Sequence, residues 1–171
     1  MVIRFLHEGA GILTFVEEDV STNREFFLFP TYDQQTSDAL KPAAGRVYQH
    51  ELRPPMAGHV YVRDYAEVVA SFEIHSAAAV QSVDGEHPFM ETEMRRRLER
   101  APSGLVALAL RVYHLSVPRR IAEREKYEDG DLFLSLPEEI PIGDVRAALS
   151  TPDFERHLAA VQRALGSADA A

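Results

Sequence analysis

The sequence predicts an α+β fold in which a mixed, largely antiparallel sheet is covered by helices. Three observations carry this prediction. Several runs are rich in β-branched and aromatic residues, prolines and polar turns bound those runs, and other segments place apolar residues at helical spacing.

The first two strands are expected at residues 11–16 and 25–29. A polar stretch separates them, and this arrangement is typical of a β-hairpin. Because residues 26–29 are apolar without alternation, the second strand is expected to be buried on both faces. Pro30 then ends its ladder, since proline has no N–H to donate.

The next extended segments lie between proline-rich boundaries. Residues 46–52 are bracketed by Lys41-Pro42 and Arg53-Pro54-Pro55, and a residue before proline is pushed out of helical conformation. Residues 59–65 alternate, and residues 68–74 continue apolar, which predicts one long bent strand or two strands.

Helices are expected near residues 76–83 and 88–100. Ser76 precedes an alanine-rich stretch, and Pro88 suits the first turn of a helix with Met90, Met94 and Leu98 at helical spacing. Residues 105–115 form a long apolar run closed by Pro118, which predicts a central strand. A last strand is expected at residues 132–136.

Two further helices are expected near residues 141–149 and 152–165. In the second, Thr151 is the predicted N-cap, Pro152 occupies the first position and Gly166 ends the helix. Its apolar face would carry Phe154, Leu158, Val161 and Leu165. Without an internal repeat or a linker, residues 1–166 are expected to form one domain, with residues 167–171 as a frayed tail.

Composition excludes several classes of protein. The 171-residue chain is 46% hydrophobic and has no cysteine, which excludes disulfide scaffolds and thiolate chemistry. Its N-terminus lacks a signal pattern, and no stretch of about 18 apolar residues occurs, so a cytoplasmic protein without membrane contact is expected. The net charge of −9 disfavours nucleic acid as a partner unless the cations are segregated on one face.

Three runs carry a resemblance to a known family. The order Phe27-Leu28-Phe29-Pro30-Thr31-Tyr32 with Gln35, then Leu40-Lys41-Pro42, then the run of residues 110–115 resembles the uncharacterised bacterial family DUF1802. The resemblance implies a shared fold and an unassigned function. Members are sometimes encoded beside restriction-type nucleases, which implies a connection with DNA transactions. The family usually has histidine where this chain has Gln34. The absence of that histidine argues against a catalytic role.

Polar side chains gather just after the buried strand that ends at Pro30. A binding site after this strand is one hypothesis, because ligands commonly bind in such loops, and Lys41 and Arg111 would meet an anion there. The alternative is that Thr31 and Asp33 cap a short helix and that Arg111 is a buried cation paired with one carboxylate. The candidate ligand-binding residues are Thr31, Tyr32, Gln35, Lys41 and Arg111.

A second hypothesis is a metal-dependent nuclease. Asp64, Glu73 and His75 would be its catalytic residues, in a pattern similar to the carboxylates of such enzymes, with Mg²⁺ or Mn²⁺ as the cofactor. No cofactor or resident metal is expected otherwise, since no two histidines have the spacing of zinc ligands. A third hypothesis is a base-binding module, which would bring aromatic side chains together in one concave pocket.

The most basic stretch, Arg95-Arg96-Arg97 with Arg100, would suit a phosphate backbone. The favoured explanation is a solvated helix face, because Glu91 with Arg95 and Glu93 with Arg97 have i,i+4 spacing. The sequence therefore favours a non-enzymatic binding or accessory module, with an unidentified ligand or protein partner, over the nuclease.

Overall fold

The computed structural model describes residues 11–17, 24–28, 39–44, 59–122 and 140–166. It has the predicted α+β fold, built on a five-stranded antiparallel sheet that curls into a half-barrel. In chain order the elements are β1 (Leu13–Val16), β2 (Glu25–Leu28), β3 (His59–Ile74), α2 (Ala77–Ser82), the 3-10 helix η2 (Asp84–Glu86), α3 (Glu91–Arg100), β4 (Leu105–Ala122), β5 (Val145–Ala147) and α4 (Thr151–Leu165).

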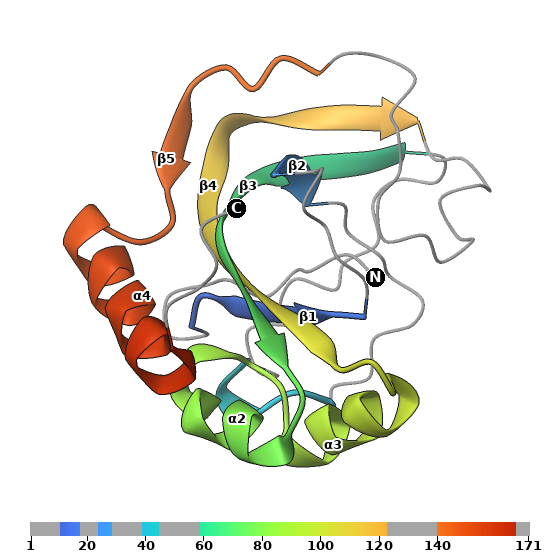
Figure 1. Cartoon of the computed structure of the whole chain (residues 1–171). Coiled ribbons are helices and arrows are strands. Elements are labelled where there is room, and N and C mark those ends of the chain that lie inside the picture. The colour runs from blue at the N-terminus through green and yellow to red at the C-terminus, as the bar shows by residue number, and fades with distance from the viewer. Residues whose placement is uncertain (1–10, 18–23, 29–38, 45–58, 123–139, 167–171) are drawn as a thin grey trace.

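Two long strands, β3 and β4, form the centre of the sheet. Their pairing extends from Ile74 opposite Leu105 to His59 opposite Ala122, with two irregularities in the register. β2 pairs with the other edge of β3, and both β1 and β5 pair with the other edge of β4. Figure 1 shows the two long strands bending together, with α2 and α3 at one end and α4 alongside.

An irregularity in β3 changes which residues face each side of the sheet. Val68 pairs with Leu110 and Ala70 pairs with Ala109, so Val69 is an extra residue in the ladder. A β-bulge of this kind bends the strand and interrupts its alternation. As a result Phe72 and Ile74 pack on the side of the helices, whereas Ala66 and Val68 pack on the opposite side.

Each face of the sheet carries its own hydrophobic core. The larger core lies between the sheet and the helices and includes Phe15, Ile74, Met94, Leu105 and Val161. The smaller core lies on the other face; its buried members are Val16, Leu28, Ala66, Leu108, Leu110 and Val112. β4 contributes alternate residues to both cores, which explains its uninterrupted apolar sequence.

The helices begin close to where the sequence predicts. Ser76 caps α2 as expected, because its hydroxyl accepts a hydrogen bond from the N–H of Ala79. α4 is capped by Ser150 rather than by Thr151, since Ser150 Oγ accepts from the N–H of Asp153. α3 starts at Glu91, so Pro88 lies before the helix and not in its first turn; its carbonyl instead accepts the N–H of Lys41.

The expected hairpin of residues 11–16 and 25–29 is wrong. β1 pairs with β4 and β2 pairs with β3, so the two strands occupy opposite edges of the central pair. β2 is an edge strand, and its Phe26 and Phe27 are only half-buried, which corrects the expectation of burial on both faces. Local pattern identified both strands, but pairing with two longer partners buries more apolar surface than a hairpin would.

The expected helix at residues 141–149 is also wrong. Residues 145–147 form β5 instead, with Val145 opposite Leu115 and Ala147 opposite Tyr113. The edge of β4 beyond β1 offers unpaired backbone groups at this point, and β5 satisfies them.

β4 itself does not stop at Pro118 but continues to Ala122. Pairing with β3 is interrupted between His114 and Arg119, so proline sits where the ladder needs no N–H. The strands expected at residues 46–52 and 132–136 and the tail at 167–171 lie outside the described residues.

Candidate functional site

Two rows of side chains cross the sheet on the face that carries α4. Register fixes both rows: Glu25 on β2 lies opposite Glu67 on β3, which lies opposite Arg111 on β4. Two residues further along, Phe27, Tyr65 and Tyr113 line up in the same way. Side chains two apart on a strand share a face, so the charged row and the aromatic row are neighbours. Together the two rows are called the tyrosine face: Glu25, Phe27, Tyr65, Glu67, Arg111 and Tyr113.

The aromatic row is continuous. The ring centroids of Phe27 and Tyr65 are 5.8 Å apart at an interplanar angle of 65°, and those of Tyr65 and Tyr113 are 6.0 Å apart at 43°. Such edge and tilted arrangements are the preferred geometries of aromatic pairs. All three side chains are half-buried, so their rings remain partly open to solvent.

The charged row makes the surroundings of the tyrosines negative. Burial, a hydrogen bond with Glu25, and the charges of Glu25 and Glu67 all raise the pKa of Tyr65 above its ordinary value. Burial also raises the pKa of Tyr113, with Glu67 adding to the effect and Arg111 opposing it. The hydroxyl of Tyr113 donates to Glu67 Oε2 over 3.3 Å, a long hydrogen bond.

Arg111 lies at the border of the tyrosine face with α4. Its Nη2 donates to Thr151 Oγ1 at 2.7 Å, and its guanidinium carbon lies 5.3 Å from the ring centroid of Phe154 and 5.8 Å from that of Tyr113. Its Nε is buried and has no hydrogen-bond partner among the described residues. Among the described residues no carboxylate lies within ion-pair distance of this guanidinium, so the expected pairing with one carboxylate is not seen there.

Lys41 lies elsewhere, against η2. Its Nζ lies 2.9 Å from Asp84 Oδ1 and donates to the carbonyl oxygens of Asp84 and His87. These contacts join the segment around Lys41 to the turn before α3. Thr31, Tyr32 and Gln35 lie outside the described residues, so a shared site for the five candidate residues stays a prediction.

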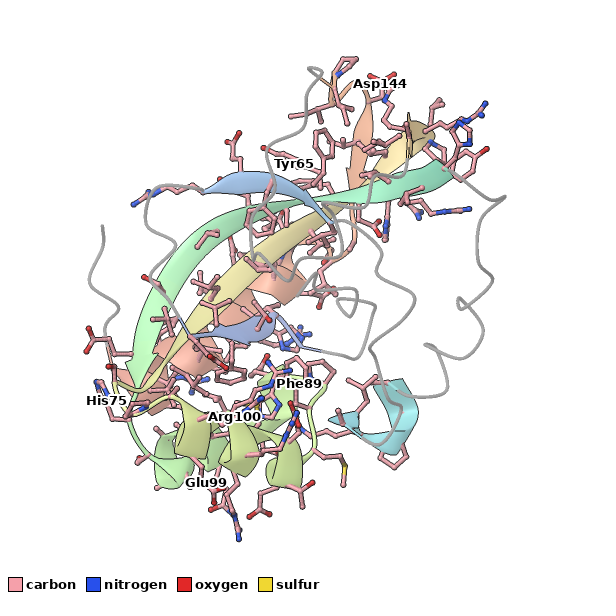
Figure 2. The ribbon with its side chains drawn as sticks, turned by 90° about the vertical axis from the view of Figure 1, so that its right-hand side faces the viewer. Tyr65, His75, Phe89, Glu99, Arg100 and Asp144 are labelled. Atoms are coloured by element: carbon pink, nitrogen blue, oxygen red, sulfur yellow. The ribbon has the colours of Figure 1, made fainter. Side chains whose placement is uncertain are left out.

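The three nuclease candidates do not come together. Asp64 pairs with His114 across the sheet, with 2.7 Å between Oδ1 and Nδ1, whereas Glu73 pairs with His75 at 3.1 Å. Figure 2 shows His75 just beyond one end of β3, whereas Tyr65, the neighbour of Asp64, lies part-way along the strand and far from it. Within the described ranges no three His, Asp or Glu side chains gather as metal ligands would. The described geometry therefore offers the nuclease hypothesis no metal centre.

Glu91 and Glu93 pair with the arginines four residues further along α3, as their spacing predicts. Arg95 pairs with Glu91 at 2.9 Å on the exposed surface. The expectation that Glu93 and Arg97 also lie on a solvated face is wrong, because both side chains are buried and paired at 2.8 Å. Arg97 turns inward because its guanidinium lies over the ring of Phe89, 4.4 Å from the centroid, beside the main core.

The family model of DUF1802, a domain of unknown function, matches residues 2–160 of the chain. The chain belongs to the DUF1802 family. The match spans nearly the whole chain and confirms the resemblance carried by residues 27–35, 40–42 and 110–115. No curated protein and no solved structure matches the chain. Membership of the DUF1802 family therefore assigns no activity to this chain.

No helix in the described part of the chain is long and apolar enough to cross a membrane. In the part of the chain that the structure describes, the tyrosine face combines a row of aromatic rings with a row of charged side chains. Sequence reasoning included Arg111 in its candidate set but missed the other members. A signal was present, since residues 65 and 67 and residues 111 and 113 each place an aromatic and a charged residue two apart. Only the register of β3 against β4 brings these pairs together.

Proposed function

We propose that this DUF1802 protein is a non-enzymatic binding module whose ligand or partner rests on the tyrosine face. One observation carries the proposal: three partly open aromatic rings line up across three strands beside a row of charged side chains. Half-exposed tyrosines with adjacent charges are typical of recognition surfaces, because the rings supply contact area at a small entropic cost and the charges fix orientation.

The rigid position of the face supports this function. Tyr65, Glu67, Arg111 and Tyr113 all lie on the central strand pair, and Arg111 is held in place by Thr151 and Phe154 of α4. A preorganised surface loses less conformational entropy on binding than a loop does. Arg111 is the member of the predicted ligand-binding set that takes part; Lys41 instead holds η2.

A link with DNA transactions would run through a protein partner in this proposal. Glu25 and Glu67 are two of the three charged residues of the tyrosine face and would repel a phosphate backbone, as would the net charge of −9. The proposed role is therefore that of an accessory protein rather than of a DNA-contacting one.

The test is an NMR titration of the 171-residue protein labelled on its tyrosine rings. Probes of different chemistry are added in turn: a lysine- and arginine-containing peptide, a glutamate-containing peptide, AMP and a thymidine oligonucleotide. At least one class of probe is expected to shift the Tyr65 and Tyr113 resonances saturably. Tyr113→Ala should abolish this binding, whereas Tyr61→Ala, on the distal part of β3, should not. The proposal is wrong if no probe shifts these two resonances, or if Tyr113→Ala leaves binding intact.

A further inference from the structure

The charged row contains an unfavourable contact that a ligand would relieve. Glu25 and Glu67 lie directly opposite each other on β2 and β3. Like charges directly opposite each other destabilise a sheet. Arg111 follows Glu67 in the same row, but its guanidinium is directed toward Thr151. A cation between the two glutamates would remove the repulsion.

The aromatic row offers a complementary feature for the same cation. The faces of Tyr rings attract cations, and arginine is the side chain most often found there because its planar guanidinium stacks on the ring. The structure already contains this type of contact at the border of the tyrosine face, where Arg111 lies over the rings of Tyr113 and Phe154. The surface thus suits a second guanidinium.

Glu67 is free to change its hydrogen bond. At present it accepts from the Tyr113 hydroxyl over 3.3 Å. A guanidinium offers two parallel N–H donors to a carboxylate at about 2.8 Å, which is a stronger interaction than one long hydrogen bond from a hydroxyl. An anionic ligand would be repelled, because the charged row contains two glutamates and one arginine, Arg111.

We propose that the tyrosine face binds an arginine side chain of a partner protein, with the guanidinium paired to Glu67 and Glu25 and stacked against Tyr65. This inference rests on the proposed binding function and adds the chemistry of the occupant. The negative charge of the whole chain would also attract an arginine-bearing segment during encounter.

The experiment uses four blocked pentapeptides of the form Gly-X-Gly-X-Gly, where X is arginine, citrulline, lysine or glutamate. Citrulline matches arginine in shape and planarity but is neutral. Binding is followed through the Tyr65 and Tyr113 ring resonances of the full-length protein at two salt concentrations. The arginine peptide is expected to bind about tenfold more tightly than citrulline, and to weaken when salt is raised.

Variants localise the effect. Glu67→Gln keeps the size of the side chain and is expected to weaken the arginine peptide about tenfold while leaving citrulline unchanged. Glu73→Gln removes an exposed carboxylate from the far end of the same strand and serves as the matched control. It should change neither affinity.

The outcomes separate the two proposals. If citrulline, lysine or glutamate peptide binds at these tyrosines as tightly as arginine, the arginine assignment is wrong while the binding function stands. If none of the four peptides, nor AMP, nor the oligonucleotide perturbs Tyr65 and Tyr113, the binding function itself fails.

Discussion

The carboxylate of Glu93 and the guanidinium of Arg97 lie 2.8 Å apart and are both buried, one turn apart on α3. Arg97 also lies over the ring of Phe89 and donates to the carbonyl of Phe15, at 3.4 Å. The pair therefore connects α3 to β1 across the main core. Burial alone would raise the pKa of Glu93, but the hydrogen bonds from Arg97 and Arg96 lower this pKa. The carboxylate is therefore charged at neutral pH.

Removing Arg97 should destabilise the protein strongly. Arg97→Met leaves Glu93 buried with only Arg96 as a partner, and breaking a buried pair in this way costs about 3 kcal/mol. The free energy of unfolding, measured by urea titration, gives the result. Arg95→Met removes an exposed pair on the same helix and should cost less than about 1 kcal/mol. Equal costs for the two variants would contradict the burial of the Glu93–Arg97 pair.

His87 should make stability depend on pH. Its side chain is fully buried, and burial together with the charge of Lys41 lowers its pKa from 6.5 to about 4. Between these values the unfolded chain takes up a proton that the folded protein does not. The free energy of unfolding therefore has its full value above pH 6.5 and falls by about 3 kcal/mol in total as the pH drops toward 4.

The measurement compares urea midpoints at several pH values between 4 and 7 for three proteins. His87→Gln should show a shallower loss of stability on acidification than the unsubstituted chain, because its side chain does not titrate. His75→Gln, at an exposed position, should retain the full slope. Parallel slopes for all three proteins would mean that His87 does not cause the dependence.

Gly11 should tolerate no side chain. Its φ of +78° is unfavourable for other residues, and a Cβ would lie 2.1 Å from the backbone carbon of Glu86. Gly11→Ala combines a strained backbone with a clash against η2 and should cost about 3 kcal/mol or more. Gly85→Ala is the matched control, since a Cβ there meets nothing within 4 Å. Thermal unfolding of both variants tests the contact, and a Gly11→Ala protein as stable as Gly85→Ala would contradict it.

Asp64 and His114 should contribute little to stability despite their short contact. The two side chains are 29% and 34% exposed, and ion pairs at such positions are worth about 1 kcal/mol at most. A double-mutant cycle of Asp64→Asn and His114→Gln measures the coupling directly. A coupling energy well above that value would point to a role for the pair that the exposed geometry does not explain.

Much of the secondary structure follows from local sequence. Ser76 at the start of α2 and the apolar face of α4 appear as predicted, and residues 59–74 form one long bent strand, the first of the two arrangements expected there. Helix starts and periodicity are properties of short segments, so local sequence records them. The helix expected at residues 141–149 fails for a long-range reason. The edge of β4 needs backbone partners, and no local pattern records that need.

The sequence by itself determined that this chain forms an α+β fold, that residues 105–115 lie at its centre and that the chain belongs to the DUF1802 family. The tertiary structure decided which residues meet. Asp64 and Glu73 are kept apart because both lie on β3, at distant positions along one extended strand. Register placed Tyr65 beside Tyr113 and Glu67 beside Arg111. The physical reason is that side chains alternate along each strand, so a shift of one residue in the pairing would move every member of the tyrosine face to the opposite side of the sheet.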